Sequence, residues 1–412
     1  MTHVLIAGAG IGGLTAALSL HAAGLGVTLV DAAHSLRPLG VGINLLPHAV
    51  RELTELGLGT VLAETGVPTA EMVHFDRHGN RIWGEPRGRA LGYHWPQYSL
   101  HRGDLQRLLL DAVLARIGEI TTNAAVTAFR DEGDRVRVDF AGGGTLVADA
   151  LIGADGLHSA VRAQLHPGEG PPLWNGIRMW RGLVETAPFL GGRTLAVAGS
   201  NESAKFVAYP VSRSAGIRGR ALVNWVAEVR LGGPGRPAAD WDRAGQLSDV
   251  LPHFADWRLG WLDVPALLEA TGRILEYPMV DRDPLPWWGR GRVTLLGDAA
   301  HPMYPIGSNG ASQSVLDARA LARHLATAPG PEQALKAYEA ERRPVTNALV
   351  LAHRAMPADR LLATVARRAP DGFTRIEDVL TAEELAAFHA AYRTTTGADV
   401  ADLNNRESWS VG

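Results

Sequence analysis

The stretch HVLIAGAGIGGLTAALSLHAAGLGVTLVD, residues 3–31, decides the fold of the N-terminal part of the chain. It begins with His3–Ala7, a short run of apolar and branched residues that is typical of a buried parallel strand. A helix-forming segment follows and ends near Gly24, and Gly26–Val30 has the pattern of a second strand. The order strand, helix, strand predicts a βαβ unit in a doubly wound α/β sheet.

The turn between the first strand and the helix carries the pattern G-x-G-x-x-G at Gly8, Gly10 and Gly13. Gly8 permits the tight turn, Gly10 lets the backbone approach a pyrophosphate, and Gly13 brings helix and strand close together. The helix N-terminus offers free N–H groups to the phosphates, and Asp31 would accept hydrogen bonds from a ribose. A glycine-rich loop without a ligand is the alternative, but the complete unit favours dinucleotide binding. It does not separate FAD from NAD(P).

Two later strand candidates end in an acidic residue. The strand at 150–154 leads into Asp155, and the strand at 292–296 leads into Asp298. Doubly wound sheets bind ligands at the carboxyl ends of their strands, so both carboxylates are candidates for the binding site. The helix that opens near Gly310 would stabilise negative charge, which a flavin ring carries when it is reduced.

Taken together, the segments GAGIGG, LIGADGLHSAVR and VTLLGDAAHPMYPIGSNGAS resemble the group A FAD-dependent aromatic hydroxylases, the para-hydroxybenzoate hydroxylase-like family. The resemblance extends from about residue 3 to about residue 350. Within that family, MWRG and LVNWV are most similar to the 5-methylphenazine-1-carboxylate 1-monooxygenase type. The resemblance implies an α/β fold, with a Rossmann-like FAD-binding domain and an interleaved α+β substrate domain built on an antiparallel sheet.

The expected domain boundaries follow from this resemblance. The FAD-binding domain is expected to be discontinuous, at 1–173 and 284–355, and the substrate-binding domain to lie at 174–283. The remaining segment, 356–412, is expected to form a C-terminal helical region and tail.

The resemblance also assigns cofactor contacts. Asp298 would bond the ribityl chain, and Asp155 would support both the pyrophosphate region and nicotinamide binding. Arg37 and Arg102 correspond to arginines that contact FAD, although each alone would more often be an ordinary surface ion pair. The expected cofactor-binding residues are Gly8, Gly10, Ile11, Gly12, Gly13, Asp31, Arg37, Gly42, Ile43, Arg102, Val126, Asp155, Asp298, Gly310 and Ala311.

The substrate pocket is expected between the middle of the chain and the loop after Asp298. Segments 206–211 and 221–229 have the pattern of antiparallel strands, and aromatic residues on them would line a pocket for a planar ring. Ordinary core packing is the alternative for each of them. His301 is expected to orient its loop more than to transfer protons. The predicted pocket residues are Trp180, Tyr209, Trp225, Met303, Tyr304 and Pro305.

The composition limits the remaining classes. The chain has 412 residues, 46% of them apolar and 20% charged, as expected for a globular protein of two packed domains. Its net charge of -3 gives no reason to expect nucleic acid or a membrane as partner. Cysteine is absent and the histidines are scattered, so no metal site is expected. A cytoplasmic monomer or homodimer is the expectation.

Only one dinucleotide fingerprint occurs, so NADH or NADPH would bind transiently beside the flavin. The resemblance implies hydride transfer to FAD, reaction of the reduced flavin with O2 to a C4a-hydroperoxide, and oxygen transfer to the substrate. We therefore predict a single-component monooxygenase of secondary metabolism that hydroxylates an aromatic or heteroaromatic acid, phenazine-like or benzoate-like, with or without decarboxylation. Epoxidation, Baeyer–Villiger insertion and N-hydroxylation remain alternative reactions. A flavin-binding protein without turnover is the alternative from another class.

Overall fold

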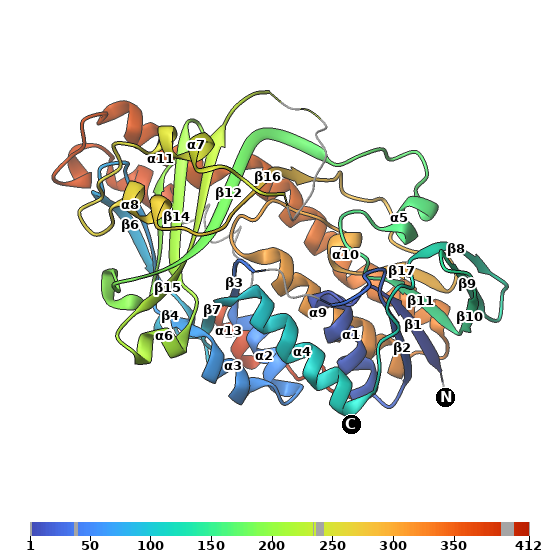
Figure 1. The fold of residues 1–412 in the computed structure, drawn as a ribbon. Coiled ribbons are helices and arrows are strands. Elements are labelled where there is room, and N and C mark those ends of the chain that lie inside the picture. Colours follow the sequence, from blue (N-terminus) through green and yellow to red (C-terminus); the bar gives the residue numbers. More distant parts are fainter. Residues whose placement is uncertain (1, 37–39, 234, 236–242, 389–398, 412) are drawn as a thin grey trace.

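The computed structural model describes residues 2–36, 40–233, 235, 243–388 and 399–411, and Figure 1 shows the arrangement of its elements. The predicted βαβ unit is present as β1 (His3–Ala7), α1 (Ile11–Ala22) and β2 (Gly26–Val30). β1 pairs in parallel with β2 and with β11 (Ala150–Gly153), and β17 (Val293–Leu295) completes a sheet of order β17-β11-β1-β2. All strands predicted for the dinucleotide-binding part therefore lie in one parallel sheet.

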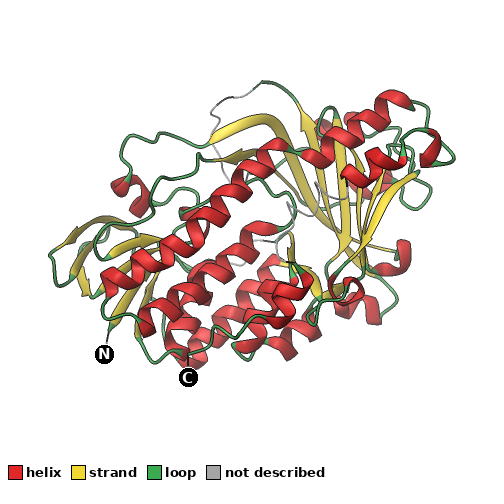
Figure 2. Cartoon of the chain, turned by 180° about the vertical axis from the view of Figure 1, so that it is seen from behind, coloured by secondary structure: helices red, strands yellow, loops and turns green. Residues whose placement is uncertain are grey.

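Long helices pack beside this sheet, and Figure 2 shows them as a layer of roughly aligned helices. α1 packs against α4 and α9, and α9 also packs against α2 and α10. The bounds of these helices are α2 (Pro47–Glu55), α4 (Arg102–Arg116), α9 (Asn309–Thr327) and α10 (Pro331–Ala355).

A second, larger sheet has seven strands in the order β16-β12-β15-β14-β13-β5-β6. It is antiparallel except for the parallel pair β13 and β5, so the expected antiparallel sheet is present. β5 and β6 come from a segment that was predicted to belong to the FAD-binding domain, so the sheet begins earlier in the chain than expected. The strands are β5 (Glu71–Phe75), β6 (Arg81–Pro86), β12 (Leu173–Thr186), β13 (Thr194–Gly199), β14 (Ala204–Pro210), β15 (Ala221–Arg230) and β16 (Ile274–Asp281).

Two three-stranded sheets complete the fold, with the orders β10-β9-β8 and β3-β7-β4. Their strands are β3 (Gly42–Leu45), β4 (Val67–Thr69), β7 (Gln97–His101), β8 (Val126–Asp131), β9 (Val136–Phe140) and β10 (Thr145–Ala148). The remaining helices are α3 (Gly59–Thr65), α5 (Ala160–Leu165), α6 (Arg213–Ile217), α7 (Leu247–Val250), α8 (Val264–Glu269), α11 (Pro357–Arg368) and α13 (Val400–Asn405).

The C-terminal region packs on both halves of the molecule. Leu362 and Val365 of α11 belong to an apolar cluster with Met72 and Val197 of the seven-stranded sheet. At the other half, the Arg51 guanidinium of α2 donates a hydrogen bond of 2.8 Å to the Leu403 carbonyl of α13. The described part of the tail is therefore fixed by specific contacts. None of the helices in the described residues combines the length and the apolar character that crossing a membrane requires.

Candidate active site

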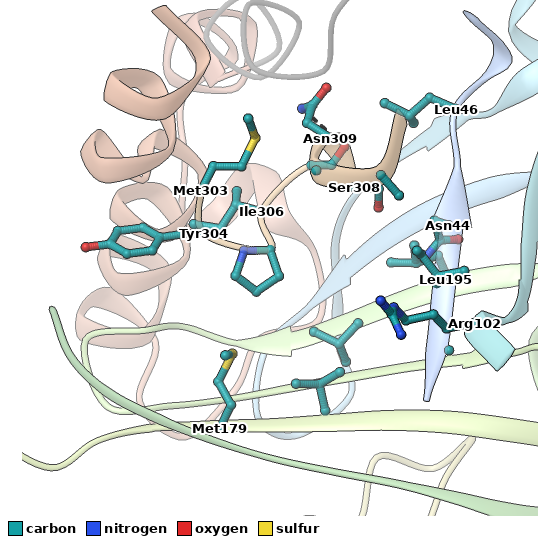
Figure 3. Close-up of a pocket in the computed structure, with 18 of the residues that line it drawn as sticks. Asn44, Leu46, Arg102, Met179, Leu195, Met303, Tyr304, Ile306, Ser308 and Asn309 are labelled. Atoms are coloured by element: carbon teal, nitrogen blue, oxygen red, sulfur yellow. Dashed lines mark hydrogen bonds between the residues drawn. The ribbon is translucent and has the colours of Figure 1, made fainter. Parts of the chain in front are cut away.

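One cavity takes its lining from both halves of the molecule: the glycine turn, β3, the loop after β17 and one face of the seven-stranded sheet. In Figure 3, Arg102 and Asn44 lie on one side of the cavity, Met303 and Ile306 lie on the loop at the other side, and Met179 lies below them. The predicted cofactor residues that line it are Gly10, Ile11, Gly12, Gly42, Ile43, Arg102, Asp298, Gly310 and Ala311.

The glycines of the turn serve two different purposes. Gly8 has a φ of +108°, and a Cβ there would lie 2.4 Å from the Ala154 carbonyl oxygen. A Cβ on Gly13 would lie 1.8 Å from the Gly8 carbonyl oxygen. These two glycines are therefore required by the packing of strand against helix. A Cβ on Gly10 would meet no atom within 4 Å, so Gly10 leaves space beside the backbone for a ligand.

Asp31 holds this turn in place. Its carboxylate accepts hydrogen bonds from the backbone N–H groups of Ala9, at 2.6 Å, and Ala33, at 2.8 Å. Gly10 caps α1 without any side-chain hydrogen bond, which leaves the N–H groups of the first helical turn available. A pyrophosphate is the kind of group that such a helix end binds.

Two charged side chains with the chemistry of flavin ligands face the cavity deep in the protein. Asp298 faces the cavity, and its partial removal from bulk water in this deep site raises the pKa of its carboxyl, a shift that neighbouring His301 and Arg102 oppose. Burial lowers the pKa of the Arg102 guanidinium, and Asp298 opposes this shift. A carboxylate acceptor, a guanidinium donor and the open glycine turn together fit the hydroxyls and phosphates of FAD.

Asp155 lies behind the cavity wall. Its carboxylate accepts hydrogen bonds from the Ser159 hydroxyl and from the Ala160 backbone N–H, at 2.8 Å for the latter. Burial raises the pKa of Asp155, and these hydrogen bonds oppose the shift. The residue thus shapes the turn at Gly156, whose backbone does line the cavity. Its expected part in nicotinamide binding stays a prediction.

Gly8, Gly13 and Asp31 support the turn without lining the cavity, and Val126 does not line it either. Val126 begins β8 in the three-stranded sheet and packs against the core of the parallel-sheet half. Arg37 lies outside the described residues. Both assignments stay predictions of the family resemblance.

His301 is completely buried beneath the loop that carries Met303. Its Nε2 lies 2.6 Å from Asp317 Oδ2, and the other oxygen of Asp317 accepts a bond of 2.8 Å from Arg342. Burial raises the pKa of Asp317, but His301 and Arg342 outweigh it and hold the pKa below its ordinary value. His301 is not among the cavity-lining residues, and its expected role in orienting the loop stays a prediction. No group of three or more described His, Cys, Asp or Glu side chains is arranged to hold a metal ion.

The predicted pocket residues divide into two groups. Tyr209, Met303, Tyr304 and Pro305 line the cavity. The prediction for Trp180 and Trp225 is wrong, because both point to the opposite face of the seven-stranded sheet. There they are buried with Phe206, Phe254 and Trp257.

The side chains that replace them on the cavity face are charged, and the sequence analysis missed them. They belong to three neighbouring strands: Arg181 of β12, Glu228 of β15 and Lys205 of β14. Each of them is next to an apolar residue that points to the opposite face of the sheet, as the pleat requires. We call that face, on which α8 and the segment near Phe254 pack, the covered face. A charged residue inside an otherwise apolar strand, as in MWRG, AKFVAYP and NWVAEV, was the available signal.

Arg181 connects the two halves of the site. Its Nη2 donates a hydrogen bond of 2.7 Å to the Gly42 carbonyl of β3, and its Nη1 lies 3.0 Å from the Tyr277 hydroxyl of β16. The Nε atom is buried and has no hydrogen-bond partner within the protein. Part of the side chain faces the cavity.

Lys205, Glu228 and Asp359 form a second charged group, which we call the Lys205 cluster. The Lys205 ammonium lies 3.0 Å from Glu228 Oε2 and 3.3 Å from Asp359 Oδ1. Burial alone would lower the pKa of Lys205, but the two carboxylates raise it above its ordinary value. The cluster therefore holds one positive and two negative groups in the cavity wall.

Comparison with known proteins agrees with this geometry. The model of an FAD binding domain family matches residues 1–214 and 282–353. The phenazine 1,6-dicarboxylic acid hydroxylase of Lysobacter antibioticus is 52% identical over 374 residues, which cover 88% of this chain and 92% of that protein. The 3-hydroxybenzoate 6-hydroxylase 1 of Aquipseudomonas alcaligenes is 33% identical over 346 residues, 82% of this chain and 84% of that protein. Among solved structures, a variant of Klebsiella pneumoniae HpxO complexed with FAD has a TM-score of 0.76 at 25% identity, covering 96% of this chain and 99% of that one.

Proposed function

The chain belongs to the FAD binding domain family and is an FAD-dependent monooxygenase that uses NAD(P)H and O2, and we propose that its substrate is a planar heteroaromatic carboxylic acid of the phenazine type. The observation that carries the substrate class is the 52% identity to a phenazine dicarboxylic acid hydroxylase, which extends over both the flavin half and the sheet half of the chain. The cavity supports this substrate class, since apolar side chains of the sheet such as Met179 and Val226 line it beside the half-buried Arg181 side chain.

In this proposal the FAD lies along the glycine turn, with Gly10 leaving room for the pyrophosphate and Asp298 and Arg102 binding the ribityl and ring portions. When bound, FAD accepts a hydride from NAD(P)H and supplies the oxygen-activating chemistry. The protein residues position the cofactor and the substrate and keep water away. Asp317 and Arg342 fix His301, and His301 fixes the loop that carries Met303 against the cavity.

The substrate would lie between that loop and the seven-stranded sheet. Met179 and Val226 rise from the sheet on one side, and Met303 and Pro305 come from the loop on the other. These side chains form apolar walls suited to a flat ring system, and they limit access of water during the reaction. Arg181 donates a hydrogen bond of 2.7 Å to the Gly42 carbonyl, which places its guanidinium beside the strand expected to follow the flavin.

The substrate proposal is tested with FAD-loaded protein and a panel of phenazine, quinoline and benzoate carboxylic acids. NADH and NADPH oxidation is followed for each compound, and the product mass is determined. We expect stimulation by phenazine acids and a gain of one oxygen atom, with or without loss of CO2. Stimulation by benzoates alone would overturn the phenazine class. A product with the added oxygen on nitrogen would indicate N-hydroxylation. A product with the added oxygen within a ring would indicate epoxidation or Baeyer–Villiger insertion.

The cofactor assignment has its own test. Asp298→Ala should weaken FAD retention, and Gly10→Val should exclude the pyrophosphate, because the space beside Gly10 would be filled. Bound FAD is measured by its absorbance after gel filtration. Wild-type flavin content in Asp298→Ala would refute that contact, and intact binding in Gly10→Val would refute the predicted path of the pyrophosphate.

We further propose a cytoplasmic enzyme, which the dependence on a nicotinamide donor favours, and a monomer or homodimer. Cell fractionation and light scattering test these two points.

A further inference from the structure

The cations on the sheet side of the cavity differ in how their charge is balanced. Arg87 lies 3.4 Å from Glu85, and the ammonium in the Lys205 cluster contacts two carboxylates. Arg181 forms no ion pair with any carboxylate of the described residues. Its guanidinium interacts with the Gly42 carbonyl and with the phenols of Tyr277 and Tyr209, all of which are uncharged. Its positive charge is therefore not compensated by the protein.

A second positive group makes this region still more attractive for an anion. Arg102 is close enough to Arg181 for the two charges to repel each other, and Asp298 is the carboxylate that acts on Arg102. Two half-buried guanidinium groups therefore line the cavity at the border between the flavin half and the sheet half, and only Arg102 has a carboxylate acting on it. An anion bound there would relieve the repulsion and would supply hydrogen-bond acceptors.

The opposite situation holds at the Lys205 cluster. Its two carboxylates and one ammonium leave a net negative charge in the wall, and its ammonium is already bonded on both sides. The strand register places it away from Arg181. Arg181 is opposite Val226, which is opposite Val207, and Lys205 lies two residues further along β14. Two strand spacings and two residues correspond to a Cα separation on the order of 12 Å.

We propose that Arg181 binds the carboxylate of the substrate, and that the cavity accommodates one carboxylate only, so that it prefers an aromatic monocarboxylate to a dicarboxylate. The inference rests on the proposed function and deepens it. A second carboxylate at the far end of a flat ring system would meet the negative Lys205 cluster and no uncompensated cation. The preferred substrate would then differ from the dicarboxylic acid in the name of the Lysobacter relative.

The test measures binding, so that it does not depend on turnover. FAD-loaded, oxidised enzyme is titrated by isothermal calorimetry without NAD(P)H. The ligands are phenazine-1-carboxylate, phenazine-1,6-dicarboxylate and unsubstituted phenazine. The variants are Arg181→Gln, Arg181→Lys and Glu228→Gln. Arg178→Gln is the matched control, because Arg178 lies on the same strand, contacts Glu276 on the covered side and does not line the cavity.

We expect the wild-type enzyme to bind the monocarboxylate at least tenfold more tightly than the dicarboxylate. Loss of a charged hydrogen bond in Arg181→Gln should weaken monocarboxylate binding about ten- to hundredfold and leave phenazine binding nearly unchanged. The monocarboxylate affinity of Arg181→Lys should lie between those of the wild type and Arg181→Gln. Glu228→Gln should reduce the ratio of monocarboxylate to dicarboxylate affinity. Arg178→Gln should bind all three ligands as the wild type does.

Other outcomes overturn the proposal. Equal monocarboxylate affinity in Arg181→Gln and wild type would exclude Arg181 as the anchor, and tighter dicarboxylate binding by the wild type would exclude the single-acid cavity. Loss of FAD with unchanged ligand affinity would assign Arg181 to the flavin. If Arg181→Gln does not fold, the ligand affinities of the wild type and of Arg181→Lys still test the proposal. A wild-type enzyme that neither binds nor turns over any aromatic acid would instead refute the proposed function.

Discussion

Trp180 and Arg181 are neighbours in the chain and lie on opposite faces of the same sheet. Trp180 is 1% exposed and belongs to an aromatic cluster with Phe206 and Trp225, whereas Arg181 faces the cavity. The covered face is closed by α8 and the segment around Phe254 and holds apolar and aromatic side chains. The cavity face carries charges in the middle of apolar strands. One face of the sheet is therefore packed into a core, and we propose that the other face recognises the ligand.

The greatest loss of stability is expected from a substitution on the covered face. Trp225→Ala removes a completely buried indole that stacks with Phe206 and donates a hydrogen bond of 2.8 Å to Thr271. The free energy of unfolding should fall by about 3–5 kcal/mol. Urea denaturation measures it, with Trp225→Phe as a milder control. A variant of unchanged stability but weakened substrate binding would break the division between the two faces.

A somewhat smaller loss is expected at the Lys205 cluster, although it lies on the cavity face. Lys205→Met removes the single cation between two buried carboxylates, which should lower the free energy of unfolding by about 3 kcal/mol at pH 7. Thermal or urea unfolding compares it with Lys205→Arg, which keeps the charge. Equal stability of Lys205→Met and wild type would show that these carboxylates do not depend on the ammonium.

The parts of this fold that were predicted from sequence depend on backbone requirements. Gly8 and Gly13 are needed because a Cβ would collide with the backbone, and Gly10 leaves open the space that we assign to a ligand. Such requirements leave a fixed spacing in the sequence, so the βαβ unit, the parallel strands and the cavity-lining glycines could be placed by number. The Asp298 loop was found because an acidic residue follows a strand candidate and because the segment resembles the family.

The side-chain pattern of the large sheet could not be predicted in this way. Whether Trp180 or Arg181 faces the cavity depends on which face the helices cover, and that is decided by contacts between distant segments such as β12 and the chain near Phe254. Aromatic residues suggested a pocket, but aromatic residues are also the commonest filling of a core. The pairing of β13 with β5 joins residues more than a hundred positions apart, and no local sequence motif predicts this pairing.

The pH dependence of stability offers a further distinction between adjacent residues of β5, His74 on the cavity face and Phe75 on the covered face. Burial, with Arg87 and Lys205 nearby, lowers the pKa of His74 from 6.5 to about 3. The folded protein keeps this histidine neutral while the unfolded chain binds a proton below pH 6.5. Stability from this group is therefore present above pH 6.5 and is lost as the pH falls toward 3, by about 1.4 kcal/mol per pH unit.

The measurement is urea unfolding between pH 7 and pH 4 for the wild type and His74→Gln. The slope should be reduced in His74→Gln but not removed, because burial also lowers the pKa of His48 to about 3. His21→Gln, at an exposed position of α1, is the control and should keep the wild-type slope. Identical slopes in His74→Gln and wild type would mean that His74 can be protonated without unfolding.

The smallest effect is expected for a single hydroxyl on the cavity face. Tyr209 is buried, and its phenol interacts with the Arg181 guanidinium, so Tyr209→Phe leaves the aromatic wall in place and removes one support of the proposed carboxylate anchor. Because Tyr209 would act on the ligand only through Arg181, we expect a loss of about 0.5–1.5 kcal/mol, below the full value of a bond to a charged group, which corresponds to roughly a two- to twelvefold weaker binding of phenazine-1-carboxylate. Calorimetric titration of the FAD-loaded variant measures this, and Tyr98→Phe, on β7 outside the cavity, is the control. If Tyr209→Phe instead lowered affinity as strongly as Arg181→Gln, the phenol itself would be the group that binds the acid, and the cavity face would recognise its ligand through a neutral donor.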